Sequence, residues 1–207
     1  MPGMTDSSDP VFRRKDETAD EHFYAAPRFV THIDEGAIAA VTQLYRDYFP
    51  SGGRILDLMS SWVSHLPPEV VYSSVTGLGM NRAELEANPR LTERVVQNLN
   101  AKPVLPFKDD AFDGAGICVS VDYLTQPVRV LREVGRVLRA GAPLVVTFSN
   151  RCFPTKVIEP WLGLNDEERL TLVKRFLELT GGFRDLETLN RSPRRGDPLY
   201  AVIGRAR

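Results

Sequence analysis

The stretch RILDLMSSW, residues 54–62, decides the fold of this chain. An apolar run carries one aspartate, Asp57, and small polar residues follow at once. Strands that are buried on both faces of a parallel sheet read as such near-continuous apolar runs. In open α/β sheets, ligands bind just beyond the carboxyl ends of the strands. The stretch therefore predicts a first strand that brings Asp57 and the residues after it to a ligand site.

Strand-like and helix-like segments alternate after this stretch. Apolar runs predict strands over residues 54–58, 70–78, 95–99, 112–121, 143–148, 185–189 and 199–204. Periodic apolar positions predict helices over residues 82–87, 126–139 and 165–180. Strands that alternate with helices form a parallel sheet with helices on both faces. The segment between the last two strands is too short for a crossover, so we expect them to pair antiparallel. The fold class is therefore α/β, a three-layer Rossmann-like sandwich.

Composition excludes several function classes. The 207 residues carry a formal net charge of -1, which gives no sign of nucleic-acid binding. A membrane span needs about 18 consecutive apolar residues, and the sequence has no such run. Cys118 and Cys152 are too few for a disulfide framework, and no Cys/His cluster has metal-ligand spacing. With a polar N-terminus that lacks an apolar signal region, these features lead us to expect a cytoplasmic protein.

The chain divides into three parts. Residues 1–20 are polar and poor in apolar side chains, which predicts a disordered tail. Residues 21–53 gather aromatic side chains and then a helical pattern, which predicts an arm and a helix packed on the domain. Residues 54–207 form the domain itself.

Three phrases resemble class I S-adenosylmethionine-dependent methyltransferases, and most closely their type 11 branch. They are ILDL at residues 55–58, LPFKDDAFD at 105–113 and EVGRVLRAG at 133–141. The resemblance spans residues 54–207. It implies a mostly parallel seven-stranded sheet with an antiparallel last strand, S-adenosylmethionine as the cofactor, and a small-molecule methyl acceptor. Neither the acceptor nor the oligomeric state follows from the sequence.

The chain departs from the family pattern at the cofactor site. The three glycine positions of the first motif are Met59, Ser61 and Val63. Glycine permits the positive φ angles that such a turn uses, and valine does not adopt them cheaply. The family's acidic residue at the end of strand two falls on Gly79. We therefore expect a remodelled site, in which hydroxyl and amide groups replace some of the usual contacts.

The resemblance places the cofactor against residues at the carboxyl ends of strands one to four. These are Asp57, Met59, Ser60, Ser61, Gly79, Met80, Asn81, Asn98, Leu99, Asn100, Val119 and Ser120.

Three residues are candidates for a catalytic role, namely His32, Asp122 and Tyr123. His32 is interpreted either as a general base held over the site by the N-terminal arm or as a structural histidine beside Asp34, which caps a helix. Asp122 and Tyr123 follow strand four and either face the ligand or cap the next loop. Methyl transfer depends mainly on positioning, so few catalytic groups are needed. The altered site leaves a second hypothesis, a non-catalytic methyltransferase-like module for binding or assembly.

Overall fold

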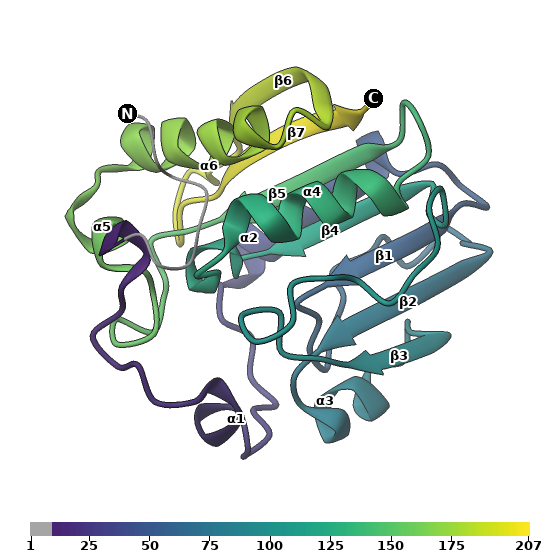
Figure 1. Cartoon of the computed structure of the whole chain (residues 1–207). Coiled ribbons are helices and arrows are strands. Elements are labelled where there is room, and N and C mark those ends of the chain that lie inside the picture. The colour runs from purple at the N-terminus through teal and green to yellow at the C-terminus, as the bar shows by residue number, and fades with distance from the viewer. Residues whose placement is uncertain (1–9) are drawn as a thin grey trace.

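The computed structural model describes residues 10–207, and a seven-stranded sheet forms its centre (Figure 1). The strands are β1 (Arg54–Leu58), β2 (Ser74–Gly79), β3 (Glu93–Val96), β4 (Gly114–Cys118), β5 (Pro143–Phe148), β6 (Phe183–Asn190) and β7 (Tyr200–Ala206). Their order is β3-β2-β1-β4-β5-β7-β6. β7 pairs antiparallel with β5 and β6, and the other pairings are parallel. The predicted fold class is confirmed.

The strand order reverses beside β1, which fixes where a ligand can enter. From β1 the chain adds β2 and then β3 on one side, and returns to add β4 and then β5 on the other. Asp57 pairs in register with Gly77 of β2 and with Gly116 of β4. The crossovers leave β1 in opposite directions, so a crevice opens at the carboxyl ends of β1 and β4.

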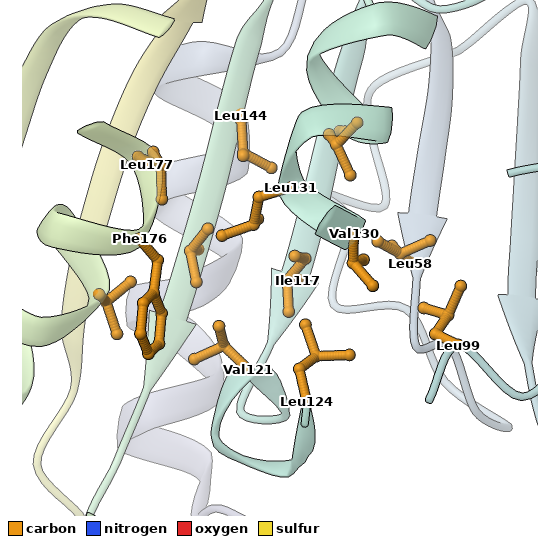
Figure 2. Close-up of a cluster of buried hydrophobic side chains, with 14 of the residues drawn as sticks. Leu58, Leu99, Ile117, Val121, Leu124, Val130, Leu131, Leu144, Phe176 and Leu177 are labelled. Atoms are coloured by element: carbon orange, nitrogen blue, oxygen red, sulfur yellow. The ribbon is translucent and has the colours of Figure 1, made fainter. Parts of the chain in front are cut away.

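Helices cover both faces of the sheet. The helical segments are η1 (Pro10–Phe12), α1 (Asp20–Phe23), α2 (Glu35–Tyr48), α3 (Arg82–Ala87), η2 (Val121–Tyr123), α4 (Pro127–Val137), α5 (Glu159–Gly163) and α6 (Asp166–Thr180). α4 and α6 bury their apolar side chains against one face, where Leu131, Phe176 and Ile117 meet in one core (Figure 2). α2 and α3 cover the opposite face. The capping box of Asn165 and Glu168 starts α6, which matches the helix predicted over residues 165–180.

Three predicted strands are longer than the observed ones, and two of them are shortened for a local reason. β2 begins at Ser74, since the preceding backbone bonds to the turn before β1: Gly52 N–H donates to Val71 O over 2.8 Å. β4 ends at Cys118 because Val119 takes a φ of 42°, which no strand allows. β3 covers residues 93–96 in place of the predicted 95–99.

Part of the expected disordered tail is packed on the domain. Phe12 is 3 % exposed in the main core, and the guanidinium of Arg14 pairs with Asp20 over 2.7 Å. The fully buried ammonium of Lys156 donates to the Thr18 carbonyl over 2.7 Å. The expectation of disorder is therefore wrong for residues 10–20, while residues 1–9 lie outside the described part. We call residues 10–33 the N-terminal arm; it lies on the side to which the arrowheads of β1, β2 and β3 point (Figure 1).

Within residues 10–207, no helix is long and apolar enough to cross a membrane. The same residues contain no group of three or more His, Cys, Asp or Glu side chains placed to hold a metal ion.

Candidate active site

A cavity of about 460 Å³ lies at the carboxyl ends of β1, β2, β3 and β4, and the N-terminal arm forms its other wall. Its size is within the usual range for small-molecule sites. Every residue that the sequence predicts as cofactor-binding, from Asp57 to Ser120, lines this cavity. Their convergence is a consequence of topology, because the carboxyl ends of parallel strands meet at one edge of the sheet.

The loop after β1 folds back onto Asp57. Met59 has a φ of 58°, so the first of the altered glycine positions keeps the left-handed backbone without a glycine. Ser61 and Val63 do not adopt a positive φ. The hydroxyls of Ser60 and Ser64 both donate to one oxygen of the Asp57 carboxylate, the former over 2.6 Å. Hydroxyl hydrogen bonds thus shape a turn that glycines normally shape.

Burial dominates the electrostatics of Asp57. It raises the pKa of this carboxyl from 3.8 to about 6, although the hydrogen bonds from Ser60 and Ser64 act in the opposite direction. At neutral pH the group is ionised in the cavity wall, next to whatever ligand enters. A carboxylate there favours a cationic group such as an ammonium.

We expect Asp57→Asn to stabilise the protein above pH 6 and to weaken cofactor binding. A carboxyl whose pKa is higher in the folded than in the unfolded state binds more protons when folded, so its contribution to the free energy of unfolding falls as pH rises from about 4 to about 6. The substitution removes the ionisable group and with it this loss of stability, which is roughly 2–3 kcal/mol. Melting temperatures of both proteins between pH 5 and 8 test it, and a variant less stable than the parent at pH 7.5 would contradict it.

Gly79, where the family has an acidic side chain, has no room for any side chain. A Cβ atom built there lies 2.1 Å from the backbone oxygen of Ser60. The Ser60 N–H donates to Leu78 O over 2.8 Å, so the remodelled loop is fastened directly against the end of β2. The first motif lacks its glycines, and residue 79 lacks an acidic side chain. Both departures from the family pattern therefore belong to one structural change.

Glu84 supplies a carboxylate five positions later, in the first turn of α3. It lines the cavity and is 9 % exposed. One carboxylate oxygen accepts from the Arg28 backbone N–H over 2.7 Å, and the other from the Ser61 hydroxyl over 2.6 Å. Each oxygen keeps acceptor capacity for a ligand. The sequence prediction did not include this residue, although Glu84 is the first carboxylate after Gly79.

The three asparagines of the predicted site bond to the arm. The Asn81 amide donates to the carbonyls of Tyr24 and Ala25, at 3.0 and 3.2 Å. The Asn98 amide donates to Glu21 and the Asn100 amide to Asp20, at 2.8 and 2.9 Å. Asn81 also caps α3 through a hydrogen bond from Glu84 N–H. These amides hold the arm across the ends of β2 and β3, a role that the sequence prediction did not assign to them.

The structure places the three catalytic candidates in different surroundings. His32 lines the cavity, and its ring packs edge-to-face on Phe153 with centroids 5.3 Å apart. Burial lowers the pKa of His32, so its imidazole is neutral at pH 7 and able to accept a proton. Tyr123 also lines the cavity, but its hydroxyl accepts from Phe153 N–H over 2.8 Å. Asp34 caps α2 through Ala37 N–H, as the structural interpretation of this segment expects.

Asp122 does not line the cavity, which corrects its placement at the ligand edge. It is 3 % exposed, and its backbone carbonyl accepts from Ile158 N–H over 3.0 Å. Residues 121–123 form η2 directly after the strained Val119, and this turn directs Tyr123 toward the cavity wall. Burial raises the pKa of the Asp122 carboxyl to about 7.

Comparison with protein-family models finds a methyltransferase match in the middle of the chain. Residues 59–146 match the family model described as a methyltransferase domain. This match covers less than half of the chain and supports the predicted resemblance to methyltransferases. The matched segment starts at Met59, directly beyond the strand that carries Asp57. A comparison with curated protein sequences gave no match.

Solved structures share the methyltransferase fold of this chain at low sequence identity. The [4+2]-cyclase SpnF aligns with a TM-score of 0.65 and 16 % identity, over 90 % of this chain and 91 % of that one. A Haloferax volcanii complex of the Trm112 methyltransferase activator with a putative methyltransferase gives 0.64 and 14 %, over 83 % and 90 %. A possible histamine N-methyltransferase from Thermotoga maritima gives 0.56 and 17 %, over 83 % and 91 %. At such identities the likeness establishes the fold alone, and one of these relatives is a cyclase by name.

Proposed function

We propose that this chain transfers the methyl group of S-adenosylmethionine to a small-molecule acceptor. The observation that carries the proposal is the convergence of residues from the ends of β1, β2, β3 and β4 on one cavity of suitable volume. The family match supports the reaction class. A Haemonchus contortus phosphoethanolamine N-methyltransferase with this fold, at a TM-score of 0.59 and 12 % identity over 81 % of this chain and 52 % of that one, has been solved with S-adenosylmethionine bound.

The polar and apolar groups in the cavity fit this cofactor. S-adenosylmethionine carries an ammonium, a carboxylate, a ribose diol, an adenine and a sulfonium. The Asp57 carboxylate suits the ammonium, and the Glu84 carboxylate suits the diol, since a carboxylate accepts two hydroxyl hydrogen bonds at once. Met80 and Leu99 offer apolar contacts for the adenine, and both line the cavity. The Ser120 hydroxyl is buried there and has no hydrogen-bond partner within residues 10–207.

The bound cofactor would supply an electrophilic methyl group on a positively charged sulfur. The work of the protein is then to hold the acceptor in line with that carbon and to exclude water. The arm closes the cavity over the ends of β2 and β3 and serves the second task. The neutral imidazole of His32 takes a proton from an acceptor that must lose one. The candidate Asp122 has no role in this reaction, because it does not line the cavity.

Titration calorimetry with S-adenosylmethionine and S-adenosylhomocysteine tests the proposal. We expect micromolar dissociation constants for both ligands. S-adenosylhomocysteine, the product of methyl transfer, should bind at least as tightly as S-adenosylmethionine. Absence of heat at millimolar ligand would exclude the enzyme and leave the non-catalytic module. That alternative has support in the hydrogen bonds that tie Asn81, Asn98 and Asn100 to the arm, since they occupy groups predicted to bind the cofactor.

Glu84→Gln is expected to weaken S-adenosylhomocysteine binding by roughly tenfold or more, since a hydrogen bond to a charged group contributes about 1.5–3 kcal/mol. The amide oxygen still accepts from Arg28 N–H, so the fold is expected to persist. Glu86→Gln is the matched control, because Glu86 is an exposed carboxylate on the same helix, 3.9 Å from Arg82. Equal affinity of both variants and the parent protein would remove Glu84 from the site.

A further inference from the structure

One wall of the cavity is built from aromatic rings that come from separate parts of the chain. The rings that meet there belong to His32, Tyr123 and Phe153, and Tyr24, Trp62 and His65 also line the cavity. Phe153 is their centre, with centroids 5.3 Å from His32 and 5.9 Å from Tyr123. Aromatic walls of this kind bind flat ligands through offset or edge-to-face contacts.

Arg28 lies at this wall with its guanidinium clamped by rings. The Cζ atom is 4.5 Å from the centroid of Phe23 and 5.5 Å from that of Phe153. Nη2 donates to the Phe23 carbonyl over 2.7 Å, which fixes the plane of the group. Nη1 is buried and has no hydrogen-bond partner among residues 10–207. A guanidinium held by its faces in this way presents its N–H groups in a defined direction.

Arg28 differs from the other arginines of the cavity in its ion pairing. Arg14 pairs with Asp20 over 2.7 Å, and Arg151 lies 3.8 Å from Asp197. Arg28 forms no ion pair with any described carboxylate, although Glu84 accepts from its backbone N–H. A buried donor without an acceptor costs about 1–3 kcal/mol, and more when it is charged. A ligand carboxylate removes this cost, because it matches the guanidinium in both charge and geometry.

We propose that the ring wall and Arg28 form the acceptor subsite, and that the acceptor is an aromatic carboxylate. The carboxylate binds the guanidinium of Arg28, and the aromatic ring packs on Phe153 and its neighbours. A cationic amine is disfavoured, since it would meet Arg28 in the same space. The assignment of this ligand as the methyl acceptor rests on the proposed function, whereas the subsite itself does not.

Benzoate and benzamide are the probes, because they share one shape and differ in charge. Binding is measured by ligand-observed NMR, with and without S-adenosylhomocysteine. We expect benzoate to bind at least about tenfold more tightly than benzamide, as a charge-assisted pair predicts. Arg28→Gln should remove this preference, and Arg28→Lys should keep part of it, since lysine retains the charge without the planar fork. Phe153→Ala should weaken both probes alike.

Arg205→Gln is the matched control. Arg205 lies on β7 with its guanidinium 5.6 Å from the ring of Tyr48, so it shares the cation–π setting without lining the cavity. Equal binding of the two probes, binding of neither, or a preference that survives in Arg28→Gln would overturn the subsite. Calorimetry with S-adenosylhomocysteine on the same samples keeps the two proposals apart. Cofactor binding without a benzoate preference refutes only the subsite, and the reverse result refutes only the methyltransferase function.

Discussion

Gly79→Ala is expected to destabilise the protein by about 2–3 kcal/mol, near the upper range for overpacking substitutions, and to weaken cofactor binding. The new methyl group would lie 2.1 Å from Ser60 O and 3.2 Å from Leu85 Cδ2. The first of these is a backbone atom, so no rotamer change relieves the clash. The loop after β1 must move away from β2, and the hydrogen bond from Ser60 N–H to Leu78 O is lost with it.

Thermal unfolding and calorimetry with S-adenosylhomocysteine measure the two effects. Gly163→Ala is the control, because a Cβ atom at Gly163 meets nothing within 4 Å. The control should leave both quantities within error of the parent protein. A Gly79→Ala protein with parental stability and affinity would show that the loop does not need to lie against β2.

The architecture was predictable because each element has a local cause. The buried strands β1 and β5 are near-continuous apolar runs, and both were predicted with their observed bounds. The start of α6 follows from the Asn165 and Glu168 pair. The end of β4 was not predictable, since valine at residue 119 gives no sequence signal for a φ of 42°. Strain of this kind is imposed by the surrounding structure rather than by the residue.

The site was predictable where it depends on strand ends and unpredictable where it depends on the arm. Residues that follow β1 to β4 converge because parallel strands share one carboxyl edge. The arm reaches that edge through hydrogen bonds between residues 56 to 80 positions apart, such as Arg28 to Glu84 and Asp20 to Asn100. No periodicity encodes such pairings. The polar composition of residues 10–20 indicated a tail, but Asp16 and Asp20 in it pair with the buried Lys156 of the domain.

Lys156→Met is expected to release the N-terminal arm. The Lys156 side chain is fully buried, its ammonium lies 3.2 Å from Asp16 and 3.5 Å from Asp20, and it donates to Thr18 O. Removal of one partner from a buried ionic network costs about 3–5 kcal/mol, because the remaining charge loses its compensation. Detachment of the arm limits this cost, since the freed carboxylates then regain water. The expected result is therefore a lower melting temperature together with local exposure of residues 10–33.

Limited trypsin digestion followed by mass spectrometry detects that exposure, because Arg13 and Lys15 offer cleavage sites on the arm. We expect cleavage at these sites to be at least about tenfold faster in Lys156→Met than in the parent, as local opening becomes easier. Lys108→Met is the control, since Lys108 is exposed and its loss removes one trypsin site in the same way. Saturating S-adenosylhomocysteine should slow the cleavage in both the parent and the Lys156 variant, because a ligand under the arm stabilises the closed form. Cleavage that is fast in the parent, and unchanged by the substitution or the ligand, would mean that the arm does not close the cavity in solution.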